Sequence, residues 1–350
     1  MTRRRIEIGV SRPILPPDPA AAYRLRWKRR RLLYRALRKR RQLATVADRT
    51  GRIRPGDILL FTCVRNEAAR LPFFLDHHRA LGVDHILVVD NGSTDGTSEM
   101  LANAPDVSVW RTGHSYRQSR FGMDWLTWLM IRHGHGHWCL TLDADELFIY
   151  PHWRTRPLQA LTEWLGASEQ PMMGTLMLDL YPEGPLGEVP YDVGTDPTVT
   201  LPLFDAGNYT IRRQEPMGNL WVQGGVRARR FFASEPRRAP TMQKVPLILW
   251  DRRYVYVNST HAALPPRLNK IQGEGERITG ALLHTKFLDQ IVRKSAEELE
   301  RREHFANASL YDNYYEALID KPTLACSFST AYRGWRHLEA LGLISRGGWT

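Results

Sequence analysis

Residues 86–97 read Ile-Leu-Val-Val-Asp-Asn-Gly-Ser-Thr-Asp-Gly-Thr, an apolar run that ends in an aspartate and a turn. The same design occurs in residues 58–67, Ile-Leu-Leu-Phe-Thr-Cys-Val-Arg-Asn-Glu, and in residues 138–146, Trp-Cys-Leu-Thr-Leu-Asp-Ala-Asp-Glu. Short apolar runs bounded by turn residues are typical of strands that are buried on both faces. Helix-like segments separate these runs, which predicts an α/β fold with a mostly parallel sheet and helices on both of its faces.

The pattern can be followed along most of the chain. We expect strands at 58–64, 86–89, 107–110 and 138–142, and helices at 68–81, 97–103 and 120–132. Later β-like runs at 174–180, 198–204, 245–250 and 254–257 lie among many Gly and Pro residues, followed by a helix at 287–305 and a helical tail from 320. The predicted domains are a basic arm (1–55), a catalytic domain (56–300, with halves 56–150 and 151–300) and a helical extension (301–350).

The clearest chemical signal is Asp143-Ala144-Asp145-Glu146, directly after a predicted buried strand. In extended backbone, Asp143 and Asp145 would point to the same side and Glu146 to the other. Paired carboxylates repel each other unless a cation lies between them, and Mg²⁺ or Mn²⁺ commonly takes such ligands together with substrate phosphates. A charged turn that simply ends the strand is the alternative.

Two other strand ends carry acidic groups, Asp90 in the 86–97 stretch and Glu67 after Val64-Arg65-Asn66. Ligands of parallel sheets bind outside the carboxyl ends of the strands, so three such junctions predict one site. The pattern excludes several other classes. An EF-hand would need Gly where Asp95 stands, no Walker A motif is present, and Gly273-x-Gly275 lacks the third glycine of a dinucleotide fingerprint.

Composition narrows the possibilities further. The 350 residues include three cysteines and no CxxC pair, which excludes zinc ribbons and thioredoxin-like chemistry. No apolar run approaches the ~20 residues that span a bilayer, and no signal-peptide pattern precedes the early prolines, so we expect a cytoplasmic protein.

The positive charge is concentrated at one end of the chain. Of 49 Lys and Arg residues, 16 lie in residues 1–50 with only three acidic residues, which leaves 33 basic and 34 acidic residues elsewhere. Residues 20–43 are rich in Arg, and Tyr23, Trp27, Tyr34 and Leu37 recur at roughly helical spacing. Such a helix could lie on an anionic membrane, pack on an acidic partner or remain a solvated arm, and we do not expect it to bind nucleic acid.

With these motifs in order, the chain resembles the family 2 glycosyltransferases of the GT-A fold, specifically over 58–150 and more faintly to about 290. The resemblance implies a nucleotide-sugar donor (UDP- or GDP-linked), Mn²⁺ or Mg²⁺, and transfer with inversion to a glycan or lipid-linked acceptor, as in polysaccharide biosynthesis. It implies a nucleotide-sugar site at Arg65, Glu67, Asp90, Asp95, Asp143 and Lys286, and metal ligands at Asp143, Asp145 and His284 in Leu283-His284-Thr285-Lys286.

The sequence departs from the family in the acceptor region. Many members carry carboxylates after a Gly-Gly pair, whereas Gly224-Gly225 is followed here by Val226-Arg227. We expect these glycines and Arg227 to contact the acceptor, since arginine cannot act as a base. Asp179 and Glu183, or alternatively Asp205 or Glu215, are the candidates for the catalytic base.

Two other classes of protein are alternatives to a glycosyltransferase. A sugar-phosphate nucleotidyltransferase uses a similar fold but usually has a glycine-rich loop after the first strand, where this chain reads Arg65-Asn66-Glu67. A non-enzymatic polyanion-binding protein would depend on the basic arm. The near-neutral remainder of the chain argues against it.

Overall fold

The computed structural model describes residues 18–271, 277–301 and 308–349. The start of the predicted arm (1–17) and the Gly273-x-Gly275 stretch lie outside these residues. The helices are α1 (Pro19–Lys39), α2 (Leu71–Leu81), α3 (Thr97–Asn103), α4 (Met123–His133), α5 (Leu158–Ala167), α6 (Pro197–Thr200), α7 (Gly225–Arg230), α8 (Ile291–Arg301), α9 (Ala308–Ile319) and α10 (Trp335–Ala340).

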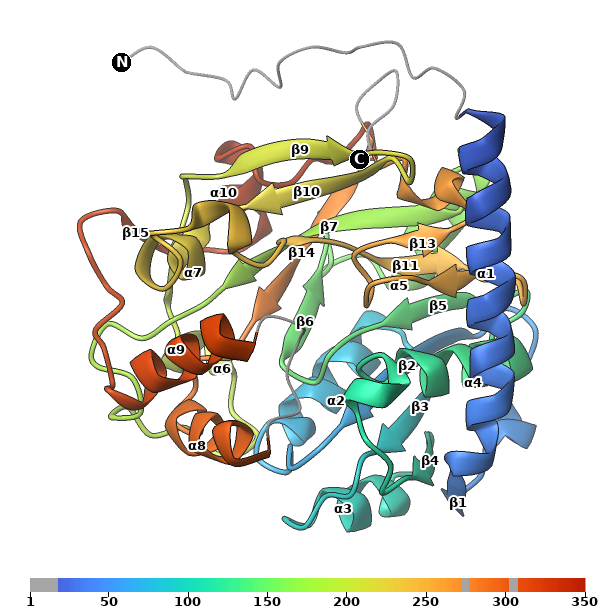
Figure 1. Ribbon diagram of the computed structural model, residues 1–350, viewed down its shortest axis with the longest axis horizontal. Helices are drawn as coiled ribbons and strands as arrows, with labels where there is room; N and C mark the ends of the chain where they lie inside the picture. Colours follow the sequence, from blue (N-terminus) through green and yellow to red (C-terminus); the bar gives the residue numbers. More distant parts are fainter. Residues whose placement is uncertain (1–17, 272–276, 302–307, 350) are drawn as a thin grey trace.

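The strands are β1 (Ala44–Ala47), β2 (Ile58–Val64), β3 (His85–Asp90), β4 (Val107–Arg111), β5 (Trp138–Thr141), β6 (Glu146–Ile149), β7 (Met172–Asp179), β8 (Leu203–Asp205), β9 (Thr210–Gln214), β10 (Asn219–Gln223), β11 (Gln243–Leu249), β12 (Val255–Tyr256), β13 (Ala263–Leu264), β14 (Thr279–His284) and β15 (Ser329–Ala331). Nine of them form one sheet in the order β1-β4-β3-β2-β5-β11-β7-β14-β6 (Figure 1). The pairs among β4, β3, β2 and β5 are parallel, as is β7–β14, whereas β1, β11 and β6 run against their neighbours. The predicted mostly parallel α/β fold is confirmed.

Helices cover both faces of this sheet because its central strands are apolar on both sides. On β2, Leu60 belongs to one buried cluster, with Phe74 of α2 and Leu161 of α5. Its neighbour Phe61 belongs to the other cluster, with Trp125 of α4. Alternate side chains of one strand thus enter opposite layers, which explains why the sequence shows a continuous apolar run instead of an alternation.

Several predicted boundaries are wrong for local reasons. The helix predicted from residue 120 begins at Met123, because Arg120 and Phe121 adopt left-handed backbone (φ 55° and 56°) ahead of Gly122. The run 198–204 is not one strand, since its first part continues the helical turn α6 and β8 begins at Leu203. The tail beyond residue 320 is not helical throughout, since it contains β15 before the short α10.

The direction of each strand determines which residues meet at one edge of the sheet. β2, β3, β5, β7 and β14 end at this edge. β11 runs antiparallel to β5 and β7, and β6 antiparallel to β14, so both begin there. Residues near the start of β11 and β6 therefore lie beside residues at the end of the parallel strands, although they are distant in sequence.

Candidate active site

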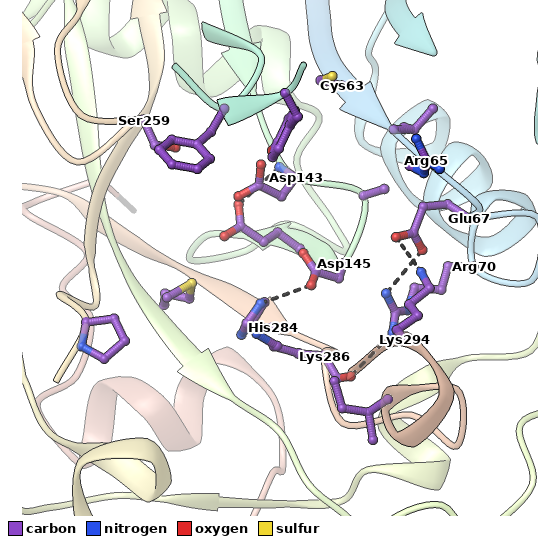
Figure 2. A pocket seen from close by; sticks show the side chains of 18 of the residues that line it. Cys63, Arg65, Glu67, Arg70, Asp143, Asp145, Ser259, His284, Lys286 and Lys294 are labelled. Atoms are coloured by element: carbon purple, nitrogen blue, oxygen red, sulfur yellow. Dashed lines mark hydrogen bonds and ion pairs between the residues drawn. The ribbon is translucent and has the colours of Figure 1, made fainter. Parts of the chain in front are cut away.

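A pocket of about 410 Å³ opens at this edge of the sheet. Of the predicted site residues, it is lined by Arg65, Glu67, Asp143, Asp145, Arg227, His284 and Lys286. Figure 2 shows Asp145 directed at His284 on one side of the cavity, with Glu67, Arg70 and Lys294 grouped on the other. The fold thus brings together predicted side chains as distant in the chain as Arg65 and Lys286, which are 221 residues apart, as the strand-end argument predicts.

One wall of the pocket contains a chain of three titratable side chains, of which Asp145 and His284 line the cavity and Asp179 lies behind His284. His284 ends β14 and pairs in register with Asp179, the last residue of β7. Its Nδ1 lies 2.6 Å from Asp179 Oδ1 and its Nε2 lies 3.1 Å from Asp145 Oδ2. A carboxylate on one ring nitrogen fixes the orientation and tautomer of an imidazole, so that the other nitrogen is presented to the pocket.

The electrostatics of this chain follow from burial among charged partners. Burial opposes the charge on Asp179, but Arg227 and His284 outweigh it and lower its pKa to about 2. Burial likewise opposes charge on His284, yet Asp145 and Asp179 raise its pKa. The pKa of Asp145 is held well below its ordinary value, because His284 outweighs the effect of burial there too. Both carboxylates are therefore ionised at neutral pH.

A second cluster surrounds Lys244, on the second residue of β11. Its Nζ lies 2.7 Å from Asp143 Oδ2 and 2.5 Å from Glu146 Oε1, and its side chain is only 3% exposed. Asp143 is 45% exposed at the pocket, whereas Glu146 is fully buried and burial raises its pKa to about 7. The predicted geometry of this stretch is wrong on one point: Glu146 does not point away from Asp143. The backbone turns at residues 144–145 instead of remaining extended, so Asp143 and Glu146 share one cation.

The far side of the pocket carries charges from the end of β2 and from α8. Glu67 contacts Arg70 at 3.1 Å and Lys294 at 2.6 Å. Arg70 also donates to the backbone oxygen of Lys286 at 3.3 Å, and the Lys286 ammonium lies 5.0 Å from the ring centre of Tyr314. These contacts join the segment after β2, the segment after β14 and helix α8 in one wall of the pocket. This wall lies next to the acidic side chains of the turn between β5 and β6.

Asp90 and Asp95 do not line the pocket. Asp90 is fully buried, and its Oδ1 accepts hydrogen bonds from the amide and hydroxyl of Ser93 at 2.9 and 2.6 Å. Its Oδ2 has no hydrogen-bond partner among the residues described and lies 3.8 Å from Arg111 Nε. Asp95 accepts from Thr97 and from the amide of Ala68, which joins the loop after β2 to the start of α3. Both aspartates thus shape the loops beside the pocket.

The residues predicted for the base and the acceptor differ in how they are placed relative to the pocket. The Asp179 side chain is 1% exposed and bonds Arg227 Nε at 2.7 Å, while Glu183 is exposed on the loop after β7, outside the residues that line the pocket. The glycine pair opens α7: the Gly225 amide donates to Asn208 Oδ1, and a Cβ on Gly224 would lie 2.6 Å from the Asn208 carbonyl oxygen. Sequence reasoning missed Arg70 and Lys294, because neither belongs to a motif, and it directed Glu146 away from Asp143 although Glu146 stands in the same motif.

Comparison with known proteins agrees with the motif order. Residues 60–161, from β2 into α5, match the family model of Glycosyl transferase family 2. The chain therefore contains a segment that matches glycosyltransferase family 2. The resemblance seen in the sequence is thereby confirmed for the family 2 segment, which supplies the Arg65–Glu67 loop and the 143–146 turn. Comparison with curated proteins finds no match.

Three solved structures resemble parts of the chain. A mannosyltransferase from Pyrobaculum calidifontis, in complex with GDP-Man and Mn²⁺, is 20% identical over 46% of this chain and 47% of that chain (TM-score 0.26). A 4-diphosphocytidyl-2C-methyl-D-erythritol synthase is 15% identical over 36% and 63% (TM-score 0.24). A protein described as a glucose-1-phosphate thymidylyltransferase, from Bacillus anthracis and in complex with sucrose, is 9% identical over 75% and 82% (TM-score 0.28). The match spans less than two thirds of the first two chains.

Proposed function

We propose that this family 2 segment and the β-rich half beyond it form a metal-dependent, inverting glycosyltransferase that uses a nucleotide-sugar donor. The observation that carries the proposal is the Asp179–His284–Asp145 chain, because its Asp145 and His284 line the same pocket as Arg65 and Glu67. It joins the family 2 segment to strands that lie outside the matched residues, so that one pocket holds both acidic ligands and cations.

The residues present fit a hard divalent cation. Asp145 offers a carboxylate oxygen and His284 an imidazole nitrogen, a donor set that suits Mn²⁺ or Mg²⁺. Among the described residues, no three His, Cys, Asp or Glu side chains gather closely enough to hold a metal alone. We therefore propose Asp145 and His284 as the protein ligands, with diphosphate oxygens completing the shell and Asp143 turned toward Lys244. A bound cation would stabilise the charge of the departing nucleoside diphosphate.

The protein's own groups would complete the binding of the donor. Arg65, Arg70, Lys286 and Lys294 provide positive charge around the pocket, which favours an anionic diphosphate. We propose that Asp179 is a positioning residue that holds His284, since its buried carboxylate is already bonded to His284 and Arg227. Its predicted role as the base is set aside on this ground.

Calorimetric titration with UDP and with GDP, each with and without Mn²⁺, tests the donor site. We expect binding to require the metal, to favour one of the two nucleotides and to be lost in Asp145→Asn. Asp192→Asn, an exposed aspartate outside the pocket, is the matched control and should bind as the unmodified protein does. Nucleotide binding that is independent of both Mn²⁺ and Asp145 would contradict the proposal.

The products separate the two enzymatic alternatives. A glycosyltransferase releases a nucleoside diphosphate, whereas a nucleotidyltransferase releases pyrophosphate from a nucleoside triphosphate. We propose a glycan or lipid-linked acceptor and a cytoplasmic reaction that serves polysaccharide synthesis. Incubation of the protein with nucleotide sugars and a cell-derived glycolipid fraction, followed by assay of both leaving groups, would identify the reaction.

A further inference from the structure

The basic helix α1 has two faces of different character. Its inner face carries Leu25, Leu32 and Ala36, which are at most 8% exposed, and the two leucines pack against Val255 and Leu264 of the small β12–β13 sheet. Arg35 anchors the helix to α4 through Asp124 at 2.8 Å. In Figure 1 the helix runs along one side of the molecule, beside α4. It is therefore a fixed part of the fold in the residues described, with a defined outer surface.

The outer face of α1 carries a stripe of large apolar and aromatic side chains. Tyr23, Trp27, Tyr34 and Leu37 are 60%, 52%, 60% and 41% exposed. At 100° per residue these four positions fall within an arc of about 80°, opposite the inner leucines. Among the described residues only one other aromatic side chain, Phe328, is as exposed as these three aromatic rings. A cluster of this kind on a soluble surface marks an interaction site.

Positive charge borders this stripe on both sides. The helix carries nine Lys and Arg residues and no acidic residue. Arg26 lies along one border, Arg31 and Arg38 lie along the other, and Arg30 lies within the stripe; all four are exposed. By contrast, residues 51–350 are almost neutral, with 33 basic and 34 acidic residues. The partner must therefore be anionic and must contact this helix rather than the body of the protein.

We propose that the outer face of α1 docks on an anionic lipid membrane. Tyr and Trp rings favour the level of the lipid headgroups, where their apolar bodies are buried and their polar atoms stay hydrated. Arginine side chains extend to reach headgroup phosphates on either side of such a stripe. The rings project from a single convex helix rather than from a basic groove, which favours a flat lipid surface over a nucleic acid.

The position of the pocket agrees with this surface. Arg35 of α1 also donates to the backbone oxygen of Gln118 at 2.9 Å. Gln118 lies in the turn between Tyr116 and Phe121, which line the pocket. The helix is thus one contact from the pocket wall, and docking would bring that wall close to acceptors held in the membrane. The docking surface is separate from the pocket, so it can fail or succeed independently of the proposed reaction.

Vesicle binding tests the proposal directly. The full-length protein is mixed with phosphatidylcholine vesicles, with or without about one third phosphatidylglycerol, and sedimented. We expect binding only to the anionic vesicles, weakening as salt is added. Arg26→Gln/Arg30→Gln/Arg31→Gln should lower the affinity roughly 100-fold, about fivefold per cation. The matched control Arg154→Gln/Arg333→Gln/Arg336→Gln removes the same charge from exposed positions on other elements and should bind as the unmodified protein does.

The aromatic stripe needs its own measurement. Tyr23→Ser/Trp27→Ser/Tyr34→Ser should also lose vesicle binding, while its circular dichroism spectrum and nucleotide binding stay unchanged. Trp27→Phe should retain vesicle binding but lose the quenching of tryptophan fluorescence by brominated lipid. Four results would each overturn the proposal. The first two are equal binding to neutral and anionic vesicles, and no binding to either. The others are equal losses of affinity in the charge variant and its control, and tighter binding to an oligonucleotide than to vesicles.

Discussion

The buried ammonium group of Lys244 offers the sharpest test of how the site is held together. Replacing it in Lys244→Met removes the cation shared by Asp143 and Glu146 at 2.7 and 2.5 Å. Asp143 is 45% exposed and can turn to solvent, whereas Glu146 is fully buried. Loss of one partner of a buried ion pair typically costs about 3–5 kcal/mol, because the other charge is left without compensation. We expect the free energy of unfolding at pH 8 to fall by about this amount.

The pH dependence of this loss identifies the group responsible. Burial raises the pKa of Glu146 from 4.5 to about 7 in the folded state. An acid whose pKa is higher in the folded state than in the unfolded state favours folding while it is protonated. This contribution to the free energy of unfolding is lost as the pH rises from the unfolded-state pKa through the folded-state pKa. The destabilisation by Lys244→Met should therefore be smaller at pH 6 than at pH 8, because Glu146 can take up a proton at the lower pH.

Urea unfolding followed by circular dichroism, at both pH values, measures these free energies. Lys244→Met/Glu146→Gln should recover much of the lost stability at pH 8, since no buried carboxylate then remains without a cation. Lys270→Met, at an exposed lysine, is the matched control and should change the free energy by less than about 0.5 kcal/mol. A Lys244→Met variant as stable as the control at pH 8 would refute this account.

Three further predictions concern the proposed metal ligands and the thiols. Asp179→Asn should weaken Mn²⁺ binding about 10- to 100-fold by releasing the ring of His284, while Asp179→Glu restores part of it; calorimetry measures both. Neighbouring carboxylates raise the pKa of His284, and a metal must displace the proton of the imidazole. The affinity for Mn²⁺ should therefore fall with decreasing pH, and Mn²⁺ binding should release a proton. Calorimetric titration in buffers of different ionisation enthalpy measures the released proton. Exposed Cys326 should react first with a thiol reagent, before buried Cys139 and before Cys63, because burial raises the pKa of the Cys63 thiol. Equal reaction rates for all three cysteines would contradict the packing around β2 and β5.

Much of the first half of the fold could be predicted because its signals are local. The continuous apolar run of β2 and the glycine at φ 99° after α2 each depend on neighbouring residues alone. The elements that were missed or mistaken depend on distant partners. β6 follows the aspartate turn so closely that it is visible only as the antiparallel partner of β14. The two-residue strand β13 was missed because it forms only by pairing with β12 under α1.

The same difference between local signals and distant partners explains which residues of the candidate site could be predicted. Asp145 and Glu67 follow strands within recognisable motifs, and both line the pocket. Asp90 and Asp95 belong to an equally clear motif, but turns of this kind also need carboxylates to bind their own backbone amides, and the sequence cannot separate the two uses. Lys244 stands in an ordinary apolar strand, and only the antiparallel direction of β11 brings it to the active edge of the sheet.

These contributions also suggest why the pocket needs both halves of the chain. The acidic side chains in its wall come mainly from the family 2 segment, at Glu67 and in the 143–146 turn, whereas Lys244, His284, Lys286 and Lys294 come from later elements. In a pocket built from the first half alone, Glu67 would still pair with Arg70, but the carboxylates of the 143–146 turn would lack Lys244 and His284 and would repel a diphosphate. The later strands supply the compensating charge at fixed positions, with Lys244 on Asp143 and His284 on Asp145. An isolated family 2 segment should therefore lack the nucleotide site even if its sheet forms.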